Sequence, residues 1–137
     1  MNREIKFRIW DDTPIEDGFK GLMINHEYAI ESSYLNDALK GKYPIMQYIG
    51  RKDKHSKEIY EGDIVRWDDM SKGEKWRVAV VELFPSLQFR IVKIKCDFIQ
   101  SAQEGKVFKF GNFIYTDTHN HLEIIGNIYE NPELLTI

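Results

Sequence analysis

The sequence has little cysteine and proline and no long apolar run. Of 137 residues, one is cysteine and four are proline. The single cysteine, Cys96, excludes an internal disulfide and a zinc site built from several thiolates. No stretch approaches the roughly 20 apolar residues of a membrane-spanning helix. Because the N-terminus is also charged and alternating, without an apolar leader segment, we expect a cytoplasmic protein.

An excess of charge of one sign is absent as well. Nineteen Lys and Arg side chains face 22 Asp and Glu, which gives a net charge of −3. A general electrostatic attraction to nucleic acid is therefore not expected of the whole chain, although a local patch could supply one. The chain is rich in aromatic residues, with eight Phe, seven Tyr and three Trp. That aromatic area suffices to build a core.

Alternation of apolar and polar side chains predicts strands along most of the chain. Residues 4–10 alternate with a period of two, which is typical of a half-buried strand. The later strands are predicted at 45–49, 58–67, 76–84, 88–96 and 122–129. Their number and spacing favour a mainly β protein whose residues 45–137 form a small barrel. The N-terminal strand and a short helical or irregular segment, together residues 1–44, are expected to pack on it.

Three local features sharpen this prediction. Ser32 or Ser33 begins a weakly patterned helix that runs to Lys40. In the corner Glu61-Gly62-Asp63, the glycine is free to adopt positive φ. The apolar side chains of the strand at 88–96 change face part of the way along it, which indicates a β-bulge or a bend.

Three blocks of the sequence, in order, resemble the YopX family of small phage and prophage proteins. The first is Arg3–Asp11, the second is Tyr48–Lys54 followed by Lys57–Val65, and the third is Ile125–Leu135. The resemblance implies a phage or prophage gene product whose C-terminal part is similar to SH3-type small barrels. It implies no established activity and no catalytic residues.

One departure from the family pattern lies in the middle block. The family turn after Asp53-Lys54 usually reads Asn-Gly, whereas this chain has His55-Ser56. Asn-Gly suits a tight turn in which both positions have positive φ, and His-Ser does not. We therefore expect a wider or less regular turn here.

A short segment near the C-terminus has the residue types of a metal site. On a strand, Asp117, His119 and His121 would share one face. Two imidazoles and a carboxylate can bind zinc or iron. The alternative is a polar loop that enters the last strand, and we prefer it because no fourth ligand is defined. No cofactor is expected, because nucleotide-binding loops and nucleophile elbows are absent from the sequence.

A basic run offers the best candidate for nucleic-acid binding. Its cationic residues are Arg51, Lys52, Lys54 and Lys57. Tyr48 and Tyr60 flank the run and could stack on bases. Asp53, Glu58 and Glu61 dilute its charge, so a solvated hairpin tip is the preferred interpretation.

The leading functional hypothesis is a non-enzymatic interaction protein that binds a host or phage protein through the barrel surface or an exposed strand edge. The runner-up is a nucleic-acid-binding accessory factor that uses the 51–57 hairpin. The third is a metal-dependent enzyme at Asp117, His119 and His121. We also expect self-association near Trp10, because the alternation places this large apolar side chain on the outer face of its strand.

Overall fold

The computed structural model describes residues 5–13, 21–68, 76–83, 86–95, 107–109 and 121–135. The strands are β1 (Phe7–Asp11), β2 (Leu22–Ile24), β3 (Ile45–Lys52), β4 (Glu58–Tyr60), β5 (Asp63–Asp68), β6 (Trp76–Glu82), β7 (Gln88–Lys95), β8 (Val107–Lys109) and β9 (Glu123–Asn127). The helices are α1 (His26–Glu31), α2 (Tyr34–Leu39) and the 3-10 helix η3 (Pro132–Leu135). The chain is mainly β, as the alternation predicts.

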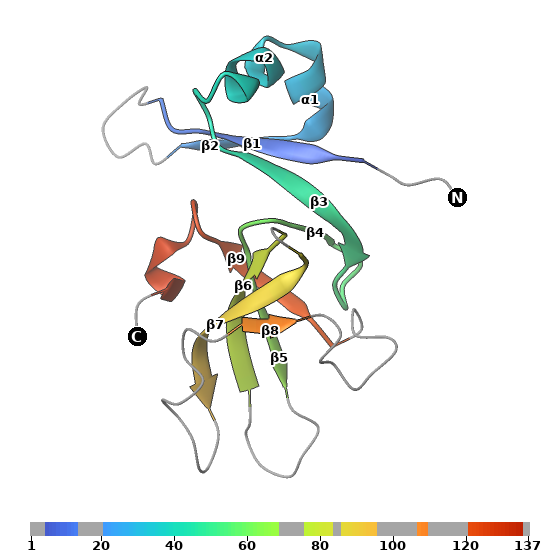
Figure 1. The fold of residues 1–137 in the computed structure, drawn as a ribbon, viewed down its shortest axis with the longest axis vertical. Coiled ribbons are helices and arrows are strands. Elements are labelled where there is room, and N and C mark those ends of the chain that lie inside the picture. Colours follow the sequence, from blue (N-terminus) through green and yellow to red (C-terminus); the bar gives the residue numbers. More distant parts are fainter. Residues whose placement is uncertain are drawn as a thin grey trace.

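The strands form two antiparallel sheets, one above the other in Figure 1. The first sheet has the order β2-β1-β3-β4, and the second has the order β8-β7-β6-β5-β9. The second sheet curls into a half-barrel, with α1 and α2 on the far side of the first sheet (Figure 1). The long strand β3 belongs to the first sheet, and its C-terminal end extends toward the barrel (Figure 1). A turn connects it to β4, with which it pairs antiparallel.

Both faces of β1 are covered. Ile9 pairs with Ile24 of β2 and packs, fully buried, in a cluster with Ala29 of α1 and Ala38 of α2. The next side chain, Trp10, points to the opposite face. It is only 5% exposed and belongs to a cluster between the two sheets. The expectation that Trp10 lies outside the protein's own core is therefore wrong, because the barrel covers the second face of the strand.

The core of the barrel comes from alternate residues of its strands. The buried cluster contains Ile59, Val65, Trp67, Ala79, Val81, Phe89, Ile91 and Leu122. The predicted bulge is confirmed, since Val78 pairs with Lys93 whereas Ala79 pairs with Ile91. Val92 is thus the extra residue, which bends β7 and lets the sheet curl.

The predicted strand at 58–67 is two strands in the structure. The chain turns at Glu61-Gly62, so that β4 joins the first sheet and β5 the second. Gly62 has a φ of 81°, as the corner predicts. Its N–H donates to the Val81 carbonyl, and its own carbonyl accepts from Ile128 N–H, both at 2.9 Å. This corner therefore connects β6 to the residue that follows β9.

Among the described residues, no helix is both long and apolar enough to cross a membrane.

Candidate functional site

Asp53 organises the turn between β3 and β4. Its carboxylate accepts the backbone N–H groups of His55 and Lys57, each at 2.9 Å, and of Ile124 at 3.0 Å. Burial of this side chain acts to raise its pKa, but the three N–H donors outweigh that effect and hold the pKa below its ordinary value. Ser56 takes a φ of 66°. The turn is irregular, as the His55-Ser56 sequence predicts.

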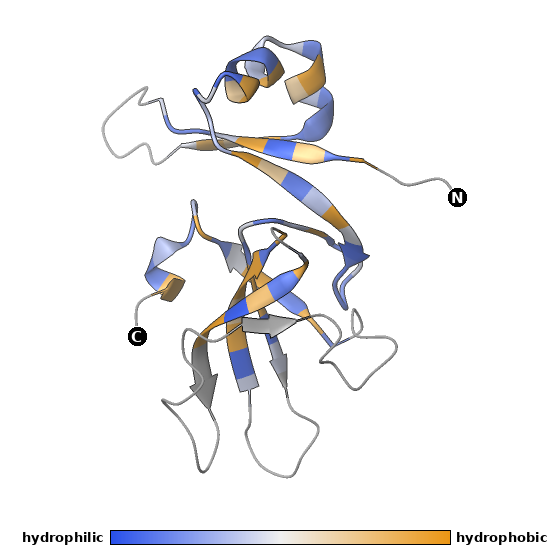
Figure 2. Cartoon of the chain, in the orientation of Figure 1, coloured by the Kyte–Doolittle hydropathy of each residue, from blue (hydrophilic) through white to orange (hydrophobic). Residues whose placement is uncertain are grey.

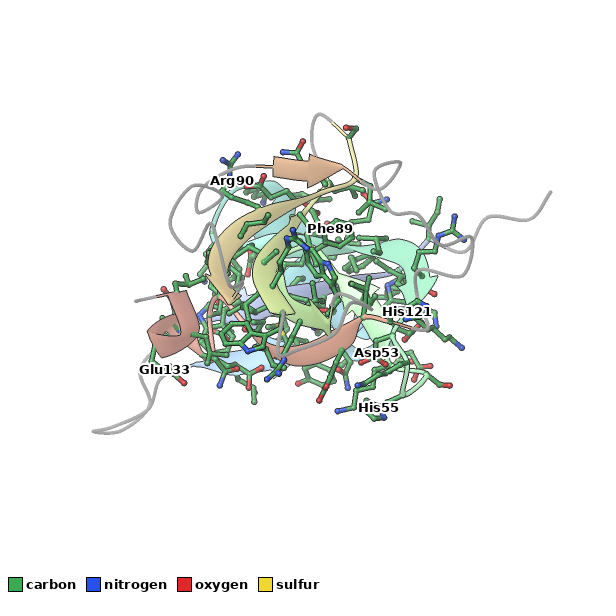
Figure 3. The ribbon with its side chains drawn as sticks, turned by 90° about the horizontal axis from the view of Figure 1, so that it is seen from below. Asp53, His55, Phe89, Arg90, His121 and Glu133 are labelled. Carbon is green, nitrogen blue, oxygen red and sulfur yellow. The ribbon has the colours of Figure 1, made fainter. Side chains whose placement is uncertain are left out.

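The same turn is attached to the barrel. Lys54 N–H donates to the Leu122 carbonyl at 2.9 Å, next to the contact between Asp53 and Ile124. The unpaired edge of β9 is therefore covered by the tip of another hairpin. Figure 3 shows His55 and His121 on the same side of the molecule as Asp53.

Every cationic side chain of the basic run is exposed. This holds for Arg51, Lys52, Lys54 and Lys57. The flanking rings are not exposed. Tyr48 and Tyr60 are 7% and 9% exposed, and their ring centroids lie 5.7 Å apart in the cluster between the sheets. Neither tyrosine offers a face to a nucleotide base in this structure.

The acidic residues near this turn have partners inside the protein. The Glu58 carboxylate lies 2.7 Å from Lys6 Nζ, and a Glu61 oxygen accepts the Gln47 N–H at 2.9 Å. Asp53 is 3% exposed and occupied by backbone donors. The cationic side chains are exposed to solvent, and Lys54 also lies 3.2 Å from the Glu123 carboxylate.

A buried ion pair lies where the two sheets meet, and sequence reasoning did not find it. Arg8 of β1 lies 2.5 Å from the Asp63 carboxylate of β5, and its guanidinium carbon lies 4.6 Å from the Tyr60 ring centroid. Asp63 also accepts the Tyr60 N–H at 2.8 Å. Burial raises the pKa of Asp63, against the opposing effects of Arg8 and the Tyr60 N–H. The pair fixes the first sheet on the barrel.

Exposed apolar side chains gather in the N-terminal layer, by which we mean the first sheet together with α1 and α2. Among the described residues, the large apolar side chains that are exposed are Ile5, Leu22, Tyr28, Ile30, Leu39 and Ile45. Three of these lie on the helices: Tyr28 and Ile30 of α1, which project from different sides of that helix, and Leu39 of α2. They are 52% to 70% exposed, and we use the name helical face for the outer surface of the two helices that carries them. Figure 2 shows apolar residues on both helices, on the side of the sheet away from the barrel. No exposed counterpart occurs among the described barrel residues.

The predicted metal ligands fall mainly outside the described residues. Asp117 and His119 lie there, and His121 is partly buried at the start of the segment that leads into β9. Within the part of the chain that the structure describes, no group of three His, Cys, Asp or Glu side chains is placed to hold a metal ion. The metal site therefore stays the less favoured alternative to a polar loop.

A match to a protein-family model agrees with the three sequence blocks. A family model described as YopX protein matches residues 6–136. A solved structure, the crystal structure of protein EF1440 from Enterococcus faecalis, is 22% identical with a TM-score of 0.49. That comparison covers 98% of this chain and 100% of the other. No curated protein matches this chain.

Proposed function

We propose, from the premise that this chain belongs to the YopX protein family, that it is a non-enzymatic protein-interaction module. It is encoded by a phage or prophage and acts in the bacterial cytoplasm. Its partner is a host or phage protein, and the contact is made by the helical face. The observation that carries the proposal is that, within the described part of the chain, every exposed large apolar side chain belongs to the N-terminal layer.

The chemistry of the helical face indicates the kind of segment that it binds. Removal of apolar side chains that are 52% to 70% exposed from water lowers the free energy and so favours binding of a partner. Exposed Glu27 and Glu31 flank Tyr28 and Ile30 along α1. A segment that places apolar side chains between Lys or Arg residues would complement this pattern.

Photo-crosslinking tests the proposal. A photo-reactive amino acid replaces Leu39 in one variant and the exposed Ser86, beside the barrel, in another. We expect a crosslinked partner in host or phage-infected cells from position 39 alone. Ile30→Lys in the same chain should abolish that crosslink, because it places a buried charge in the interface. Its melting temperature should stay unchanged, since Ile30 is exposed.

Three outcomes would contradict the proposal. Equal crosslinking from position 86 would mean that the contact is unspecific. A crosslink that survives Ile30→Lys would place the contact elsewhere. A product with the mass of two copies would replace the foreign partner by a second copy of this chain, which light scattering would confirm as a homo-oligomer.

A further inference from the structure

We infer that the turn at residues 51–57 is a binding surface for the phosphate backbone of nucleic acid, separate from the helical face. Four cationic side chains, Arg51, Lys52, Lys54 and Lys57, are exposed on this short turn. The rest of the chain is acidic on balance, so the surface is a local one.

The backbone of the turn is held in one shape before any ligand arrives. The Asp53 carboxylate bonds to N–H groups within the turn and on β9, and Lys54 N–H bonds to Leu122. Binding therefore orders the lysine and arginine side chains alone, with little backbone entropy lost. A flexible basic loop with the same composition would lose more.

The carboxylates that dilute the charge in the sequence do so much less in three dimensions. Asp53 is turned inward onto three N–H donors, and Glu58 is paired with Lys6. Lys54 contacts Glu123 at 3.2 Å, but both side chains are about 40% exposed. An exposed pair of this kind contributes little free energy, so phosphate can displace the carboxylate.

The buried tyrosines determine the type of recognition. Base-specific or single-strand binding commonly uses exposed aromatic rings, and Tyr48 and Tyr60 are buried here. The lysine and arginine side chains contact phosphate, which is the same for every sequence. We therefore expect binding that does not depend on sequence and does not favour single strands over duplex.

Salt dependence gives a quantitative test with a labelled duplex in fluorescence anisotropy. Four phosphate contacts predict a loss of affinity of roughly 100-fold between about 50 and about 200 mM salt. The slope of log K against log salt is negative, and in the double variant Lys52→Gln/Lys57→Gln its magnitude should decrease by about 2. The matched control Lys40→Gln/Lys42→Gln lowers the net charge equally in the N-terminal layer and should keep the wild-type slope.

The melting temperatures of both double variants should equal that of the wild type, so that lost binding is not lost folding. Duplex binding that survives Lys52→Gln/Lys57→Gln, or that falls as much in the control, would overturn the inference. So would polyglutamate that displaces the duplex at equal charge, since the surface would then fit an acidic protein. Much tighter binding to a single strand would contradict recognition of the backbone alone.

The two surfaces can be tested separately. Lys52→Gln/Lys57→Gln should keep the crosslink from position 39, and Ile30→Lys should keep duplex binding. A failure of one proposal therefore leaves the other standing.

Discussion

The N-terminal layer and the barrel differ in how they bury apolar side chains. The barrel places Phe89, Val65 and Leu122 in a core where each is at most 1% exposed. In the N-terminal layer, the helices contribute only the small side chains Ala29 and Ala38 to the buried cluster. Each helix is six residues long, too short to be stable alone. The barrel therefore buries large side chains in its core, whereas the helices of the layer leave their large apolar side chains exposed.

The difference between the two regions can be tested by removing a large side chain from each. Phe89→Ala in the barrel should lower the free energy of unfolding by about 4 kcal/mol, because it leaves a cavity in a fully buried cluster. Leu39→Ala, at a position that is 70% exposed, should change it by less than about 0.5 kcal/mol. Denaturant unfolding measures both. Equal losses would show that the layer and the barrel contribute alike.

The second prediction concerns the ion pair that joins the regions. Arg8→Met should lower the free energy of unfolding by about 3 kcal/mol, because Asp63 stays buried without its cation. Adding Asp63→Asn should recover much of the loss, since no buried charge is then left unpaired and the amide oxygen can still accept the Tyr60 N–H. A thermal melt of the single and double variants decides this. A double variant that is less stable than Arg8→Met would mean that the unpaired Asp63 charge is not the cause of the loss.

The third prediction concerns the turn that joins β3 and β4 to the barrel. Asp53→Ala should lower the free energy of unfolding by about 2 kcal/mol, because three backbone N–H groups lose their acceptor.

The pH dependence of this effect has a definite sign. The pKa of Asp53 is lower in the fold than its ordinary value of 3.8. The stabilisation is therefore fully present above that ordinary value and is lost as pH falls through the lowered pKa. Chemical unfolding at several pH values measures the difference in free energy of unfolding between wild type and Asp53→Asn. This difference should stay constant near neutrality and become smaller in acid. A constant difference in acid would show that Asp53 has no lowered pKa.

The smallest expected effect is at the corner between the two sheets. Gly62→Val should cost about 1 to 2 kcal/mol, because its φ of 81° strains a β-branched residue. A Cβ at this position would meet Ile128 at 3.5 Å, an ordinary contact, so crowding adds little. Gly62→Asn should lose less, because Asn tolerates positive φ better. Thermal melts test the order, and equal losses would point to crowding instead.

Alternation along the chain predicted the barrel because its strands bury one face each. It predicted a bulge or a bend within 88–96 for the same reason, since a change of face within a strand needs an extra residue, and the structure places the bulge at Val92. The helix α2 was predicted from its cap signals, with Gly41 at a φ of 89°. The elements β2 and α1 were missed, because three and six residues are too few to establish a period.

Sequence periodicity could not show which surfaces meet. It placed Trp10 in solvent because it reports the faces of a strand and not the second sheet that covers one of them. For the basic turn, the cationic residues were predicted, but Asp53 was counted as a diluting charge. An Asp whose carboxylate accepts the backbone N–H two residues later is typical of an Asx-turn, and that signal could have placed the Asp53 carboxylate inward.

The contact between Asp53 and Ile124 also bears on the order of events during synthesis. These residues are 71 positions apart, so the basic turn acquires its final hydrogen bonds only after the last strand has emerged from the ribosome. Until then the hairpin can form its own internal bonds to His55 and Lys57 but has no support from β9. Translation that stops before residue 124 would therefore yield a chain whose basic turn is present but not held in place.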